Sequence, residues 1–268
     1  MLEFQKKTLK CNFALSIYDK NILDSFNNCE FSFFDSLEFN TGLFEDFSKL
    51  SHVNPNKIKK IAKIILNMHI NEPVIKEIVR QNDNIKENFC TELASQINQF
   101  PRQLTNIIIN FDLDEAMRNK NYSSNLEKIL KSTYYLLNSK RTIIIPLNLP
   151  ANDNNIFNFT HKFLGKISIP IKVGINLNPH KISKKNNFAE YIQLLRYYLK
   201  FVKITYDIAS GHKLRTNNLI PILKQLQNQN FDDIIALNIT NVHFDNLSNI
   251  INETEEIIIQ SLAEINSP

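Results

Sequence analysis

The chain has 268 residues, a length that suits one large α/β barrel or two small domains. Its net charge is only +4, and Lys and Arg are spread along the chain rather than clustered, which argues against a nucleic-acid-binding surface. No stretch approaches the ~18 apolar residues of a membrane span. Cys11, Cys29 and Cys90 form no zinc or disulfide motif, so we expect a cytoplasmic protein with no membrane partner.

Glycine is scarce, with four residues in the whole chain. They form neither a dinucleotide-binding nor a P-loop motif, so phosphate-bearing cofactors are disfavoured and none is expected. Asparagine is abundant and tolerates left-handed backbone conformations, so it is expected to cap helices and turn corners where glycine usually would.

The first half of the chain has an irregular pattern. A strand is expected at residues 13–17, a second at 29–34 and a weak third near 50–53. Three helices are expected to follow, at residues 57–68, 73–80 and 85–97.

The second half alternates strand and helix about every 30 residues, the size of one βα unit. Strands are expected at residues 105–111, 141–147, 169–177, 201–206 and 234–239. Between and after them, helical patterns cover residues 124–137 (opened by a capping box at Ser124 and Glu127), 157–164, 188–199, 217–226 and 245–265. The strands are continuous apolar runs, which indicates burial on both faces and a parallel sheet.

Three strands plus five give eight, and eight parallel strands with intervening helices close into a (β/α)8 barrel, the TIM-barrel fold. An open doubly wound sheet is the alternative, because its sequence pattern is similar. No Pro- or Ser-rich linker interrupts the chain, so residues 1–268 are expected to form a single domain.

Several segments occur in an order that resembles xylose-isomerase-like sugar isomerases and epimerases. The C-terminal segments 219–226 and 230–239 are similar to the last βα unit of that family. Segments 142–151, 173–180 and 201–207 are similar to three of its strand ends, so the likeness spans roughly Asn106 to Ile239. It implies a divalent metal at the barrel mouth, held by Glu, Asp, His and Glu, that polarises a sugar carbonyl and hydroxyl.

This chain departs from the family at each metal-ligand position. The last Glu corresponds to Asn238, and the Asp corresponds to Asn178, or to Asn176 in a shifted register. The first Glu falls on Leu147 or Asn148, and the His falls on Ile204 between Lys203 and Thr205. Because neutral amides hold divalent ions weakly, these departures predict a divergent member with no bound metal.

Four asparagines lie near expected strand ends, where a barrel carries its active site: Asn110, Asn148, Asn178 and Asn238. They are candidates for a ring of carboxamides that binds a neutral sugar or polyol. The alternative is that an Asn-rich composition places Asn at strand ends without a role.

Acid/base candidates are His180, Asp207, Lys203 and Asp112. His180 and Asp207 match family positions. Lys203 is either a desolvated nucleophile able to form a Schiff base or a lysine that reaches solvent through the helix layer. Asp112 is either a base at the mouth or a helix N-terminal acid that meets the helix dipole.

Two function classes follow. The first is a degenerate, metal-free barrel that binds a small carbohydrate-like ligand. The second is a sugar or sugar-phosphate isomerase or epimerase with non-standard acid/base groups or metal ligands. A scaffold role would be favoured if Leu147, Phe157 or Tyr206 plugged the mouth.

Overall fold

The structure is a computed structural model of the chain. It describes residues 9–17, 24, 27, 33–42, 54, 56, 59–69, 72–100, 102–111, 113–138, 141–148, 163–165, 167–179, 188–208, 214–240 and 246–267.

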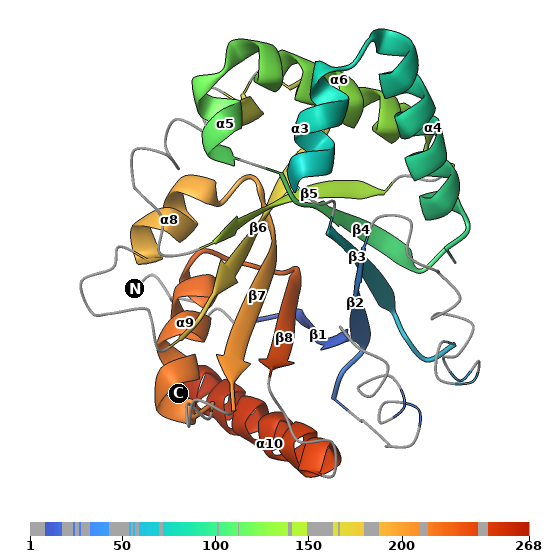
Figure 1. The fold of residues 1–268 in the computed structure, drawn as a ribbon. Coiled ribbons are helices and arrows are strands. Elements are labelled where there is room, and N and C mark those ends of the chain that lie inside the picture. The colour runs from blue at the N-terminus through green and yellow to red at the C-terminus, as the bar shows by residue number, and fades with distance from the viewer. Residues whose placement is uncertain are drawn as a thin grey trace.

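Eight parallel strands form a closed barrel in chain order, and β1 pairs with β8 to complete it (Figure 1). The prediction of a (β/α)8 barrel is confirmed, and the open sheet is excluded. The strands are β1 (Asn12–Ile17), β2 (Ser36–Gly42), β3 (Lys63–His69), β4 (Leu104–Ile109), β5 (Thr142–Asn148), β6 (Ile171–Leu177), β7 (Leu199–Asp207) and β8 (Ile234–Thr240).

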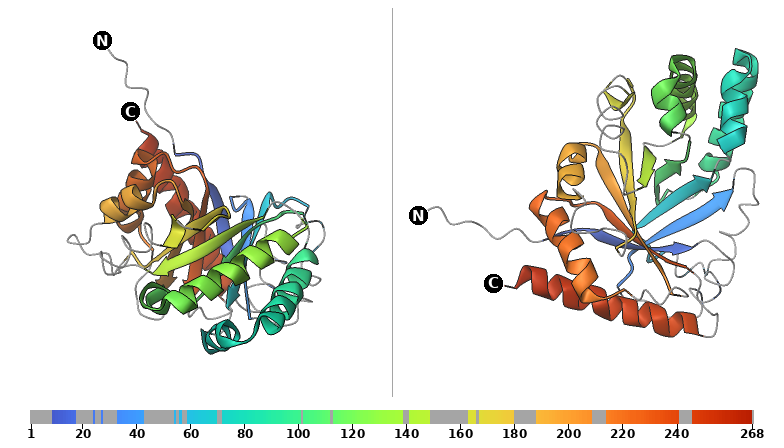
Figure 2. Two further views of the ribbon diagram at one scale, coloured as in Figure 1. Left: turned by 90° about the horizontal axis from the view of Figure 1, so that it is seen from above. Right: turned by 60° about the vertical axis from the view of Figure 1, so that its left-hand side comes forward.

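Helices surround the barrel in two groups on opposite sides (Figures 1 and 2). The helices α3 (Glu72–Arg80), α4 (Asp83–Asn98), α5 (Leu113–Arg118) and α6 (Lys120–Leu136) pack on one another beside β4 and β5. The helices α8 (Phe188–Leu195), α9 (Thr216–Asn228) and α10 (Leu247–Asn266) cover the other side, where α9 packs along α10. None of the described helices is long and apolar enough to cross a membrane.

Asparagine takes the local roles that glycine and serine often have. Asn82 caps α4 by accepting a 3.0 Å hydrogen bond from the backbone of Ile85, and Asn119 caps α6 in the same manner. Asn230 adopts a positive φ of 54° just after α9.

The apolar core has two parts, because alternate residues of each strand face opposite sides of the barrel wall. The larger part lies between the strands and the helices. The smaller part fills the interior of the barrel with Ala14, Ile65, Ile108, Ile144, Phe201, Ile234 and Ala236. Gly174 lies at this layer, and an added Cβ would come within 2.9 Å of Ile144 and 3.0 Å of Phe201. The missing side chain therefore makes room for the Phe201 ring.

The second and third strands were predicted in the wrong places. The second expected strand, at 29–34, is replaced by β2, and its residues 29–32 lie outside the described part. The third, at 50–53, also lies outside it, while β3 occupies the second half of the expected helix at 57–68. In β3, Ile64, Ile65 and Leu66 are successive fully buried residues, which suits a strand covered on both faces. The helices at 73–80 and 85–97 are confirmed as α3 and α4.

Several helix ends differ from those expected. The Ser124–Glu127 capping box lies inside α6, which begins earlier behind the Asn119 cap. Helix α9 begins at Thr216 with Arg215 as its N-cap residue. Helix α8 ends at Leu195 rather than at residue 199, since residues 196–198 form a turn that leads into β7. Residues 157–162 and 245 lie outside the described part.

Candidate functional site

The barrel interior changes from apolar to polar toward the carboxyl ends of the strands. On several strands an interior apolar residue is followed two positions later, on the same face, by a polar one. These pairs are Ala14 and Ser16, Ile65 and Asn67, Ile108 and Asn110, Phe201 and Lys203, and Ala236 and Asn238. The apolar layer is therefore a floor, and the polar residues lie above it at the end where (β/α)8 enzymes carry their sites.

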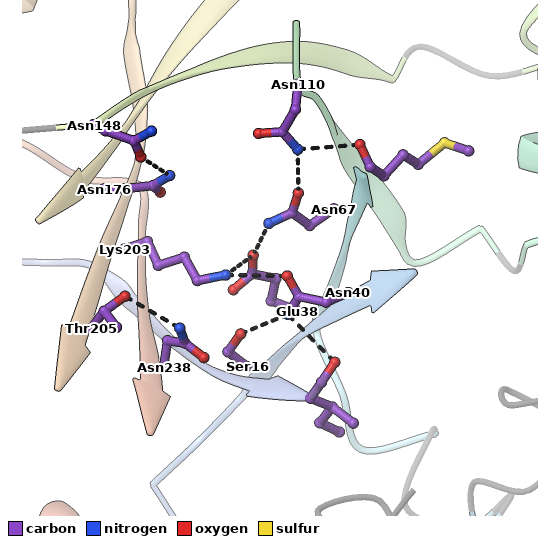
Figure 3. A network of polar contacts seen from close by, with 12 residues as sticks. Ser16, Glu38, Asn40, Asn67, Asn110, Asn148, Asn176, Lys203, Thr205 and Asn238 are labelled. Carbon is purple, nitrogen blue, oxygen red and sulfur yellow. Dashed lines mark hydrogen bonds and ion pairs between the residues drawn. The ribbon is translucent and has the colours of Figure 1, made fainter. Parts of the chain in front are cut away.

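At the centre of this polar layer, Lys203 forms a buried ion pair with Glu38 (Figure 3). The Nζ of Lys203 lies 2.9 Å from Glu38 Oε1 and donates a second hydrogen bond of 3.2 Å to Asn40 Oδ1. The exposed fraction of the Lys203 side chain is 8%, and that of Glu38 is 0%. Lys203 therefore points into the barrel and does not reach solvent through the helix layer.

A chain of amides continues from Glu38 along the barrel wall (Figure 3). Asn67 Nδ2 donates to Glu38 Oε1 at 2.7 Å, and Asn110 Nδ2 donates to Asn67 Oδ1 at 3.1 Å. On the other side of Glu38, Asn40 Nδ2 donates to Ser16 Oγ at 2.9 Å. These contacts hold side chains from β1 to β3, and Asn110 just after β4, in one hydrogen-bonded network.

Two further polar pairs come from strands β5 to β8. Asn176 Nδ2 donates to Asn148 Oδ1 at 2.9 Å, and Asn238 Nδ2 donates to Thr205 Oγ1 at 3.2 Å. In register, Asn148 pairs with Asn176, Asn176 with Lys203, and Thr205 with Asn238. Carboxamides thus continue around this part of the wall on both sides of Lys203.

Two buried acceptor atoms in this layer have no hydrogen-bond partner among the described residues. They are Glu38 Oε2 and Asn238 Oδ1. An unsatisfied buried polar group costs ~1–3 kcal/mol, more when it is charged. Both atoms can accept a hydrogen bond from a donor that enters the barrel.

The structure brings together some of the predicted site residues. Lys203, Asn110, Asn148 and Asn238 all belong to the polar layer. Asn178 follows β6 directly and Asp207 ends β7, both at the mouth, where each is partly exposed and makes a polar interaction. His180 and Asp112 lie outside the described residues and remain predictions.

Glu38 is the principal residue that the sequence pattern did not reveal, together with Ser16, Asn40 and Asn67. The signal that identifies it is the alternation in β2, where Leu37 and Phe39 are buried against the helix layer while Ser36, Glu38 and Asn40 have the opposite parity. A search for continuous apolar runs passes over such a strand.

The buried titratable groups with perturbed pKa values lie elsewhere. Burial raises the pKa of the Tyr206 hydroxyl, which bonds to Thr254 of α10. Burial, with a contribution from nearby Asp35, raises the pKa of Cys11 to about 12. Tyr206 and Leu147 both belong to the core between strands and helices, so neither of them plugs the mouth. Phe157 lies outside the described residues.

The donor set of the polar layer consists mainly of amide and hydroxyl groups. Within the described part of the chain, no group of three or more His, Cys, Asp or Glu side chains could hold a metal ion. The carboxylate of Glu38 already has the ammonium of Lys203 as its counterion.

A separate cavity of about 260 Å³ lies between α4 and α6, away from the barrel interior. Its lining mixes acidic and basic side chains, and Lys86 is already paired with Asp83 and Asn125. The cavity therefore presents charges of both signs, unlike the amide- and hydroxyl-rich polar layer.

No family model and no curated protein matches the sequence. Solved structures match its shape. An L-ribulose 3-epimerase superimposes with a TM-score of 0.60 at 9% identity, over 96% of this chain and 95% of the other. A D-allulose 3-epimerase from Methylomonas sp. gives 0.57 at 9% identity, over 95% and 99%. A GH18 chitinase from Pseudoalteromonas aurantia gives 0.56 at 8% identity, over 93% and 99%. At these identities the likeness shows the fold alone.

Proposed function

We propose that the chain binds a small neutral polyhydroxylated molecule, a sugar or polyol, at the carboxyl ends of its barrel strands. The observation that carries this proposal is the polar layer around Lys203 and Glu38, set on an apolar floor inside a closed barrel. In barrels of this kind the strand ends converge on the ligand site.

The chemistry of the layer favours hydroxyl groups over charged ligands. A carboxamide offers both donors and acceptors, and so does a hydroxyl, so the two pair in either direction. Glu38 Oε2 and Asn238 Oδ1 are acceptors ready for hydroxyl donors. The positive charge of Lys203 is balanced by Glu38, which leaves no free cation in the described layer to attract a phosphate.

The same chemistry supports a site without a divalent metal. Hard cations favour carboxylate oxygens, and the described part of the layer offers one carboxylate, Glu38, whose charge is already balanced. Asn178 and Asn238, where the resemblance to xylose-isomerase-like enzymes implies carboxylates, supply only neutral oxygens. We therefore propose a divergent, metal-free barrel rather than a metal-dependent isomerase.

A second candidate is a sugar isomerase or epimerase that works through its own acid/base groups. The observation that favours it is the 2.9 Å separation of a proton donor, Lys203, from a proton acceptor, Glu38, in a buried place. Asp207 at the mouth is a further candidate, and His180 and Asp112 remain candidates from the sequence. Proton NMR in D2O distinguishes this enzyme from a binding protein. An acid/base isomerase exchanges a carbon-bound sugar proton with solvent, and a binding protein does not.

The binding proposal is tested by thermal unfolding of the full chain against xylitol, sorbitol, D-ribulose and a pentose phosphate. A neutral ligand at 100 times its Kd raises the free energy of unfolding by about 2.7 kcal/mol. We expect Asn238→Leu to abolish the shift and the exposed Asn228→Leu at the end of α9 to preserve it. Equal shifts in both variants, or none in the wild type with any neutral ligand, contradict the proposal.

A further inference from the structure

We propose that Lys203 is a nucleophile that captures the carbonyl group of an aldehyde or ketone ligand as a Schiff base, with Glu38 as its proton shuttle. The inference rests on the proposed function, because it assigns a covalent step to the same site. It also names a substrate class, the open-chain carbonyl form of a small polyhydroxylated compound.

Lys203 is better placed to act as a nucleophile than Lys200, the other lysine of β7. Lys203 lies in the buried polar layer directly above the Phe201 floor, so its amine is shielded from bulk water. Its hydrogen bonds to Glu38 and Asn40 engage two of the three ammonium hydrogens. Lys200, by contrast, has a side chain that is 40% exposed and pairs with Asp233.

Glu38 is placed to carry the proton that a lysine must lose before it attacks. Its Oε1 lies 2.9 Å from Lys203 Nζ and also accepts from Asn67, while its Oε2 has no partner among the described residues. Transfer of one proton from Nζ to the carboxylate gives a neutral amine and a neutral carboxylic acid. The Asn67 bond holds the carboxyl group in place during the transfer.

The covalent step then balances without an added reagent. The amine nitrogen forms a bond to the carbonyl carbon, the carbonyl π pair moves to oxygen, and that oxygen receives the proton held by Glu38. The resulting carbinolamine loses its hydroxyl as water, with a second proton from nitrogen passing through Glu38. The net change converts the Lys203 ammonium and a carbonyl compound into an iminium ion and one water molecule.

Charge is conserved at the buried site throughout. The iminium carries the same positive charge as the ammonium, so Glu38 keeps its counterion and no isolated charge is left in the interior. The buried carboxylate favours the cationic iminium over a neutral imine, because an opposite charge in a desolvated site is strongly stabilising. The pair is therefore suited to hold the covalent state as well as the free state.

Thr205 supplies a hydroxyl one pleat nearer the mouth. It lies two residues after Lys203 on the same face of β7, a distance of ~6.6 Å along the strand. Its Oγ1 accepts from Asn238 Nδ2, so its own hydrogen is directed elsewhere. We assign that hydrogen to the oxygen of the carbinolamine, which makes Thr205 a positioning residue for the step.

The test is reductive trapping in the full chain. Glycolaldehyde or dihydroxyacetone is added with sodium cyanoborohydride, and the reduced adduct is located by peptide mass spectrometry. We expect saturable labelling of the Lys203 peptide ahead of the Lys200 peptide, and protection by xylitol, which has no carbonyl. This comparison within one molecule requires no variant. Labelling that is unsaturable and spread over surface lysines, with Lys203 not preferred, overturns the proposal.

Substitutions of Lys203, Lys200 and Glu38 test the assignment in the same trapping experiment. Lys203→Arg keeps the charge opposite Glu38 and is expected to lose the adduct, whereas Lys200→Arg is expected to retain it. Glu38→Gln removes the proton shuttle and is expected to slow trapping roughly 100-fold. If Lys203→Arg labels as fast as the wild type, the assignment is wrong. Polyol binding without any Lys203 adduct would refute the covalent step alone and leave the proposed binding function standing.

Discussion

Lys203 Nζ lies 2.9 Å from Glu38 Oε1, although the two residues are 165 positions apart in the sequence. They belong to β7 and β2, and the contact spans the seam where β1 and β8 close the barrel. The ion pair is therefore a direct consequence of closure, since an open sheet would leave these strands at a distance. The same ion pair therefore stabilises the barrel interior and takes part in the proposed chemistry at the mouth.

Breaking this pair should destabilise the fold strongly. Lys203→Met leaves the Glu38 carboxylate buried without its counterion, and we expect the free energy of unfolding to fall by about 3–5 kcal/mol in urea titrations. The double variant Lys203→Met with Glu38→Gln removes both charges at similar volume, so it should recover most of that loss. A double variant that loses the sum of the two single effects would show that the two side chains do not interact.

Gly174 should resist enlargement. In Gly174→Ala the new Cβ meets Ile144 at 2.9 Å and Phe201 at 3.0 Å, so we expect a loss of ~1–3 kcal/mol from overpacking of the barrel floor. Adding Phe201→Leu should restore part of this loss by making room. Thermal unfolding of the single and double variants measures both effects, and an unchanged Tm for Gly174→Ala would contradict the packing described for the floor.

Stability should depend on pH through Glu255 of α10. Burial raises the pKa of its carboxyl, an effect only partly offset by the hydrogen bond from the Phe33 backbone. The folded state thus favours the protonated form, and this stability is lost as pH rises from the ordinary value of about 4.3 to the raised one. Glu255→Gln should therefore raise the free energy of unfolding at about pH 7 and change it little below about pH 4. The exposed Glu256→Gln is the control, and equal effects of the two would refute the assignment.

A metal site should be obtainable by restoring carboxylates. We expect the wild type to show no rise in Tm with Mn²⁺, and the double variant Asn178→Asp with Asn238→Glu to acquire one. The control places the same charges elsewhere, with Asn217→Asp and Asn228→Glu on exposed positions of α9. Stoichiometric metal in the wild-type protein by elemental analysis would contradict the metal-free proposal.

The fold could be predicted from the sequence because most strands of the second half are apolar on both faces. The run at residues 234–237 before Asn238, for example, has the pattern of a buried parallel strand. The same criterion failed in β2, where Glu38 alternates with Leu37 and Phe39. It failed in β3 for another reason, because an apolar run beside Lys59 and Lys60 also fits a helical period.

The candidate site could be predicted only in part. The recognisable apolar strands at 201–206 and 234–239 made Lys203 and Asn238 candidates, because Lys203 lies within the first and Asn238 near the carboxyl end of the second. Glu38 could not be paired with Lys203 from sequence, since the contact depends on the order of strands around the closed barrel. The sequence also left open which face of β7 carries Lys203. The structure shows that it is the interior face, because Phe201, two residues earlier, lies in the interior floor.

The mouth is proposed to bind a neutral polyol without a metal. Isothermal titration calorimetry of the full chain with xylitol, after dialysis against EDTA, tests it most directly. We predict saturable binding that EDTA leaves unchanged and that Asn238→Leu removes. Binding that disappears in EDTA, or the absence of saturable binding in the presence and absence of chelator, would contradict the claim.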